Sequence, residues 1–206
     1  MRILLAFAMG LCLFGLASCY SLTKEECAAA DWRVIGESDG AAGYDPQSRF
    51  ADHTKSCARI KVVPDQSQWN EGYKVGVLRY CTPMNGLARG EAGDAYYNVC
   101  PPDRSAGFLK GYGIGQNAHK ARNRVSELRN DISSKRSQMD ERYALLKQTK
   151  DEAEYRRIRA EIDDLDRQMR WSRDYLRDAE FDLQDAEREV QVFRQNPNAI
   201  LLPSPY

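Results

Sequence analysis

The residues of this chain best suited to covalent chemistry are its six cysteines. Four of them remain once the first nineteen residues are set aside: Cys27, Cys57, Cys81 and Cys100. An even number in an exported chain is typical of disulfides. Of the three possible pairings we favour Cys27–Cys57 and Cys81–Cys100, because sequential pairing closes the shortest loops. A metal site that includes His53 is the alternative, but the chain has no Cys-x-x-Cys pair.

Cys19 lies at the end of a predicted export signal, in a sequence pattern suited to lipid attachment. Arg2 precedes an apolar run over residues 3–15, which is shorter than the roughly 20 residues of a membrane-spanning helix. Leu16-Ala17-Ser18-Cys19 then follows the pattern of a bacterial lipobox, in which two small residues precede a thiol that accepts lipid. We predict a lipoprotein signal peptide over residues 1–18 and acylation of Cys19, which attaches the chain to a membrane.

The residue after Cys19 bears on which membrane the chain would occupy. An Asp at that position favours retention in the inner membrane of Gram-negative bacteria, and here the residue is Tyr20. We therefore expect the outer membrane, with the protein facing the periplasm. The alternatives are a plain secretory peptide, with Cys19 in another cystine, and an uncleaved anchor.

Glycine and aromatic residues recur in the part of the chain that holds the four cysteines. Segments 69–76 and 108–115 share the pattern aromatic-x-x-Gly-Tyr-x-x-Gly, and segment 31–43 repeats glycines at the same spacing. Glycines four residues apart lie on one helical face and allow a second backbone to approach closely, which predicts tight helix packing. The alternative is a groove that binds a glycan or peptide. Its candidate residues are Trp32, Asp39, Tyr73 and Tyr112. The glycine-rich stretch 85–93 is predicted to be an irregular loop.

The sequence offers little for catalysis. Asp31, Asp39 and His53 are the only candidates for a hydrolase, and no nucleophile-elbow or zinc-protease motif is present. Thirty basic and thirty acidic residues cancel, so no global charge attracts nucleic acid. We expect no catalytic residues, no cofactor and no metal.

Three motifs, in order behind the lipobox, carry a resemblance to a known family. They are Asp31-Trp32-x-x-Ile35-Gly36-x-x-Asp39-Gly40-x-x-Gly43, Gly72-x-x-x-Gly76-x-x-x-Tyr80-Cys81 and Tyr97-x-x-Cys100-Pro101. Over roughly residues 27–120 the chain resembles domain-of-unknown-function family 2799, a group of uncharacterised Gram-negative lipoproteins. The resemblance implies an envelope lipoprotein with four cysteines and implies no activity.

The remaining chain is charged and helical in pattern. Residues 116–194 contain no Gly, Pro or Cys, and apolar residues recur there at alternating steps of three and four, the period of a coiled coil. We therefore predict a mainly α fold. A disulfide-stabilised, Gly/aromatic-rich domain over 19–104 would precede an antiparallel coiled-coil hairpin over 105–195 and a Pro-containing tail over 196–206.

The two arms of this hairpin would meet near residue 149, where Thr149 and Glu152 could form a capping box. That midpoint places Met139 near Ile158 and Lys135 opposite Ile162. A single continuous helix that dimerises is the alternative. Trp171 and Tyr175 lie off the apolar seam, and could either contact a partner or pack on the facing helix.

Together these patterns predict a non-enzymatic interaction protein of the cell envelope. The membrane would bind it through acyl chains on Cys19, and a partner protein would bind the coiled coil. An envelope glycan such as peptidoglycan is the alternative ligand.

Overall fold

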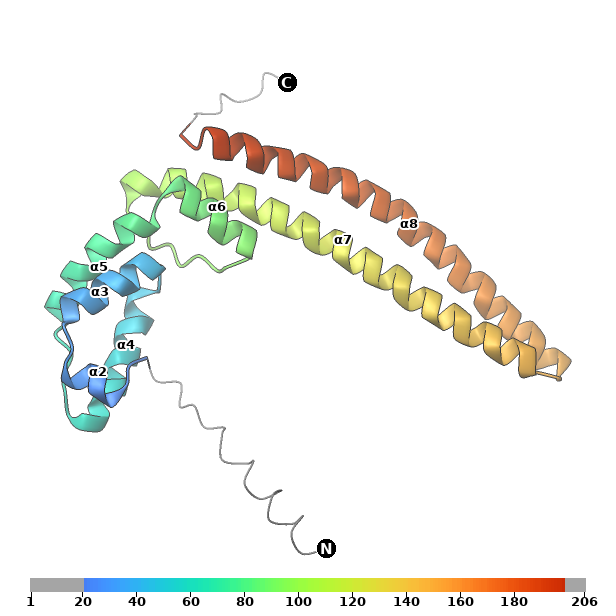
Figure 1. Ribbon diagram of the computed structural model, residues 1–206, viewed down its shortest axis with the longest axis horizontal. Coiled ribbons are helices and arrows are strands. Elements are labelled where there is room, and N and C mark those ends of the chain that lie inside the picture. The colour runs from blue at the N-terminus through green and yellow to red at the C-terminus, as the bar shows by residue number, and fades with distance from the viewer. Residues whose placement is uncertain (1–20, 199–206) are drawn as a thin grey trace, which may run out of the picture. The chain divides into compact units, whose positions relative to one another are not determined.

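A computed structural model describes residues 21–198 (Figure 1). These residues form two compact units. Unit 1 comprises residues 21–80 and 97–99, and unit 2 comprises residues 81–96 and 100–198. The described residues form helices and no strand, as the mainly α prediction requires. The signal peptide, Cys19 and the end of the tail lie outside the described residues.

Unit 1 contains four α-helices and one short 3₁₀ helix. The first three are capped at their N-termini by side chains: Thr23 forms a capping box with Glu26, while Asp31 and Asp45 accept backbone N–H groups. The elements are α2 (Lys24–Ala28), α3 (Trp32–Ala42), α4 (Pro46–Cys57), η1 (Ala58–Ile60) and α5 (Gln66–Tyr80).

Helices α3 and α5 cross through glycine faces, as the four-residue spacing predicts. A Cβ atom on Gly36 would overlap the carbonyl oxygen of Trp69, and one on Gly72 would overlap that of Arg33. The two backbones are therefore in direct contact. The packing gained there offsets the helix-propensity cost of about 1 kcal/mol for each glycine.

Unit 2 contains α6 (Pro83–Ala92), α7 (Pro102–Gln148) and α8 (Glu152–Gln195). The irregular loop predicted for residues 85–93 is wrong, because Thr82 caps a helix there. Gly86 and Gly90 lie directly against the backbone of α7 at Phe108 and Tyr112. Glycine content alone suggested a loop, whereas the four-residue spacing serves a second helix crossing.

The two crossings repeat one another in detail. Gly43 and Gly93 both end their helix with positive φ, at 74° and 76°. The Tyr73 hydroxyl donates to the carbonyl of Tyr44, and the Tyr112 hydroxyl donates to the carbonyl of Asp94, each at 2.6 Å. A single glycine-and-tyrosine crossing is thus used once in each unit.

Both predicted disulfides are confirmed. Cys27–Cys57 joins α2 to the last residue of α4 in unit 1, and Cys81–Cys100 joins the segments that precede α6 and α7 in unit 2. The first bond therefore links two helices outside the α3–α5 crossing, whereas the second links the segments that lead into the α6–α7 crossing. The second disulfide belongs to the compact unit that also contains the long helices.

Helices α7 and α8 run antiparallel (Figure 1). Arg122 pairs with Glu187 near one end of the pair, and Arg142 pairs with Glu161 near the other. The long helix is interrupted at residues 149–151, so the chain turns back instead of continuing. Asp151 caps α8 by accepting the N–H of Glu154, so the capping box predicted at Thr149 is wrong.

The register of α7 and α8 also differs from the prediction. The prediction places Lys135 opposite Ile162, but Lys135 Nζ donates to Ser172 Oγ at 3.3 Å. Ser172 donates in turn to Asp131 at 2.6 Å, and Lys135 forms an ion pair with Asp131. The polar interruptions of the two apolar seams therefore meet each other, which a midpoint calculation cannot anticipate.

Candidate functional site

The densest polar cluster in unit 1 surrounds Asp39, a residue that is 3% exposed. The Asp39 Oδ2 atom lies 2.7 Å from His53 Nε2 and 3.0 Å from the indole nitrogen of Trp69. Arg49 Nε donates to the other carboxylate oxygen at 2.7 Å. Helices α3, α4 and α5 each contribute to this cluster, so Asp39 connects three helices.

Opposing effects set the pKa of Asp39. Burial raises it, but hydrogen bonds from His53, Arg49 and Trp69 favour the charged form and hold the pKa below its ordinary value. Asp39 is therefore a carboxylate at neutral pH. Because that carboxylate only accepts, we assign the His53 proton to Nε2 from the hydrogen-bond network.

The second nitrogen of His53 faces Ser21. Its Nδ1 lies 2.8 Å from Ser21 Oγ, which lies 3.0 Å from Ser56 Oγ. The Ser21 backbone N–H also donates to Ser56 Oγ at 3.0 Å. We call Ser21, His53, Ser56 and Asp39 the Ser21 network. His53 and Ser56 are fully buried, and Ser21 is half-buried.

A hydroxyl, an imidazole and a carboxylate in series also occur in nucleophilic catalysts. Here the imidazole is enclosed and the Ser21 hydroxyl is shared with a second serine, so the network holds the start of the described chain against α4. Of the hydrolase candidates, Asp39 and His53 join this network, whereas Asp31 caps α3. Sequence reasoning missed Ser21, since no periodicity relates it to His53.

The residues proposed to line a glycan-binding groove lie in two different units. Trp32 and Tyr73 are buried in unit 1, where Asp39 also lies. Tyr112 belongs to unit 2 and stacks on Phe108. The hydroxyls of both tyrosines are used by the backbone bonds of the two crossings. These side chains act in helix packing.

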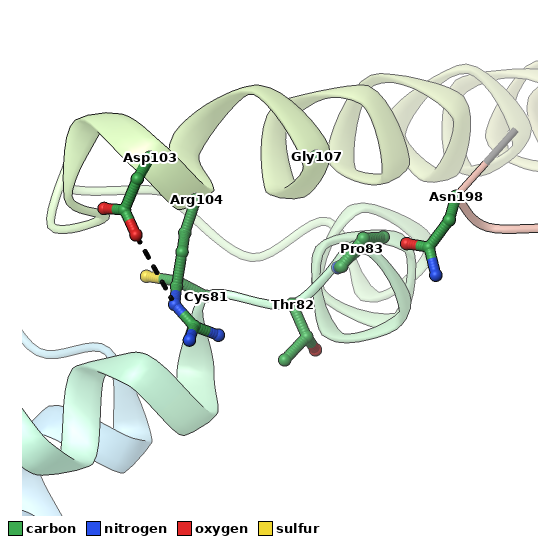
Figure 2. Close-up of a pocket in the computed structure, with 7 residues that line it drawn as sticks. All are labelled: Cys81, Thr82, Pro83, Asp103, Arg104, Gly107 and Asn198. Carbon is green, nitrogen blue, oxygen red and sulfur yellow. Dashed lines mark ion pairs between the residues drawn. The ribbon is translucent and has the colours of Figure 1, made fainter. Parts of the chain in front are cut away.

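Unit 2 contains a hollow of about 370 Å³ beside the second disulfide (Figure 2). Its only charged groups are Asp103 and Arg104, which pair at 3.9 Å. The lining offers no histidine, and its cysteine is in a disulfide. The residues are Cys81, Thr82, Pro83, Asp103, Arg104, Gly107 and Asn198.

The outer face of α8 carries an exposed aromatic pair. Trp171 is 63% exposed and Tyr175 is 60% exposed, one helical turn apart. Both side chains are mostly exposed, which does not favour the interpretation that they pack on the facing helix. We call Trp171 and Tyr175 the α8 aromatic patch.

Residues 31–117 match the family described as "Protein of unknown function (DUF2799)", which confirms the resemblance drawn from the motifs. No curated protein and no solved structure matches the chain significantly. Within residues 21–198, helices are either too short or too polar to cross a membrane.

Proposed function

We propose that this protein, whose residues 31–117 match the model of that family, is a lipid-anchored, non-enzymatic interaction protein of the cell envelope. Acyl chains on Cys19 attach it to the outer membrane, facing the periplasm. The pair α7–α8 acts as a coiled-coil hairpin, and the α8 aromatic patch binds a partner protein.

The coiled-coil interpretation rests on the buried seam between α7 and α8. Val125 and Leu128 of α7 pack with Ala179 of α8 in one apolar cluster. Ile158, Ile162 and Met169 are buried closer to the N-terminus of α8. The successive spacings from Ile158 through Ile162 and Met169 to Ala179 are four, seven and ten residues, which follows a heptad seam. Charged residues on the flanks, such as Arg129 and Glu180 at 2.7 Å, pair across the two helices.

The α8 aromatic patch is the observation that carries the proposed binding role. These two large aromatic side chains, on a regular helix, remain more than half exposed within the described chain. Trp, Tyr and Arg are the residue types enriched at the centres of protein interfaces, and Arg167 precedes Trp171 by one turn. This composition fits a protein partner. The glycan alternative has no such support, since its aromatic residues pack the helix crossings.

Site-specific photocrosslinking in intact envelopes tests the proposed role. A photoreactive amino acid at Trp171 is expected to capture a discrete protein, and the Tyr175→Ala change is expected to weaken that capture. The matched control places the same photoreactive residue at Phe181, which is 61% exposed on α8. Equal capture at both positions, or none at Trp171, contradicts the proposal.

A further inference from the structure

We propose that the Ser21 network docks the start of the mature chain onto unit 1, so that the lipid on Cys19 holds one end of unit 1 against phospholipid headgroups. This end is formed by α2, the last turn of α4, η1 and residues 61–63. The inference rests on the proposed lipid anchor and adds the surface that meets the membrane.

The docking is complete from Ser21 onward. The Ser21 N–H and hydroxyl are both bonded to buried partners, Ser56 and His53. Arg59 Nη2 donates to the Leu22 carbonyl at 2.7 Å, and Thr23 begins the capping box of α2. Each residue from 21 to 23 is therefore fixed to unit 1, and no flexible spacer follows Ser21.

The covalent chain allows little separation from the bilayer. Only Tyr20 lies between Cys19 and Ser21. A fully extended chain spans at most ~3.6 Å per residue, so Cys19 is within about 7 Å of Ser21. This is comparable to the Debye length of ~8 Å at physiological ionic strength. Charges close to Ser21 are therefore brought to within about one Debye length of the bilayer surface, where part of their interaction with the headgroups survives screening.

The chemistry of this end suits an anionic lipid surface. Residues 53–64 contain three bases, Lys55, Arg59 and Lys61, and no acid. Val63 is 86% exposed beside them. On α2, which contacts η1, Glu25 and Glu26 oppose Lys24, and Glu26 is engaged by the Thr23 N–H. A basic segment with an exposed apolar side chain is typical of membrane-surface contact.

Depth-dependent quenching tests the contact on the lipidated full-length protein. The protein is reconstituted in vesicles of phosphatidylethanolamine and phosphatidylglycerol, and a fluorophore is attached to a Val63→Cys variant whose two native disulfides are verified by mass mapping. Lipids with a headgroup spin label are expected to quench this fluorophore. A flexible Gly-Ser spacer between Tyr20 and Ser21 is expected to abolish the quenching. Equal quenching with and without the spacer, or none in either protein, overturns the inference.

Further readouts separate this inference from its premise. Incorporation of labelled fatty acid at Cys19 reports the anchor alone, and its absence overturns both proposals. Hydrogen exchange at the Ser21 amide reports the docking, and is expected to speed up in Ser56→Ala but not in Ser48→Ala, which alters an exposed serine of the same helix. Labelling of Ser21 by a fluorophosphonate would make the serine a nucleophile and overturn the docking role.

Discussion

At the scale of single residues, Asp39 shows how a buried charge can hold helices together. Its carboxylate has three donors from three side chains, so the cost of burial is met by hydrogen bonds to the charged form. The sequence marked Asp39 and His53 as polar candidates. It could not pair them with Ser21, because their contact depends on how α4 packs against the start of the chain.

The first prediction concerns Asp39→Asn. The folded-state pKa of Asp39 lies below its unfolded value, so its stabilising contribution is present above the unfolded pKa and is lost as pH falls through the folded pKa. We expect the variant to lose about 3–5 kcal/mol of unfolding free energy at neutral pH, and the loss to shrink in acid. Urea unfolding across pH measures it.

Asp52→Asn is the matched control for this prediction. Asp52 lies one residue before His53 on α4, but its side chain is exposed. We expect the unfolding free energy of the Asp52→Asn variant to change little at any pH. A pH-independent loss in Asp39→Asn would mean that packing, and not the charge, explains the effect.

At the scale of helices, glycine spacing was the most informative pattern in the sequence. It predicted close helix packing, which the α3–α5 crossing shows. In residues 85–93 the glycine content predicts a loop, whereas the same four-residue spacing forms a helix crossing there. The register of α7 and α8 was missed for a different reason: it is set by Lys135, Asp131 and Ser172 meeting one another, a three-body contact that neither helix encodes by itself.

The second prediction compares two glycines of α7. A Cβ at Gly115 would overlap the Leu87 carbonyl oxygen, whereas a Cβ at Gly113 meets nothing within 4 Å. We expect Gly115→Ala to destabilise unit 2 by about 1–3 kcal/mol, as an overpacked core does. Gly113→Ala is expected to stabilise the helix by up to about 1 kcal/mol. Thermal unfolding of both variants measures the difference, and equal shifts would contradict the crossing.

The third prediction tests the seam between α7 and α8. Ile162 is 2% exposed, so Ile162→Asp places an unpaired carboxylate between the helices. We expect a loss of about 3–5 kcal/mol in the stability of that pair, with unit 1 still folded. Circular dichroism measures the helix content, and hydrogen-exchange protection of the unit 1 amides shows whether unit 1 stays folded. Val192→Asp, at an exposed position of α8, serves as the control.

At the scale of the whole molecule, the chain has two compact units, each with one helix crossing and one disulfide. The cysteine count and the coiled-coil period indicate a disulfide-crosslinked region followed by long helices. The boundary between the units could not be predicted from composition. The α6–α7 crossing has the same glycine pattern as the α3–α5 crossing, but α7 is also one of the two long helices.

The fourth prediction follows from this organisation. Replacing Cys27 and Cys57 together by Ala removes a crosslink over 30 residues, and is expected to destabilise unit 1 by about 3–4 kcal/mol. The Cys81 and Cys100 double replacement is expected to destabilise unit 2 instead. Amide exchange resolved by peptide measures both. Destabilisation of both units by either replacement would show that they unfold as one.

The fifth prediction concerns attachment of the whole chain. Because Cys19 is the cysteine in lipobox context, Cys19→Ser is expected to stop processing and fatty-acid labelling. The variant is also expected to leave the outer-membrane fraction. Cys12→Ser, within the apolar run, is expected to be processed and labelled normally. Continued sedimentation of Cys19→Ser with outer membranes would contradict the lipid anchor.

The two glycine crossings also have an evolutionary consequence. The family match ends at residue 117, so it includes both crossings but little of the two long helices. Eight glycines lie at the crossings, where any side chain would collide with a facing backbone; they are Gly36, Gly40, Gly72, Gly76, Gly86, Gly90, Gly111 and Gly115. We expect relatives to keep these eight positions while the length of the helical arm drifts freely, since adding or removing heptads beyond the crossings leaves both of them intact.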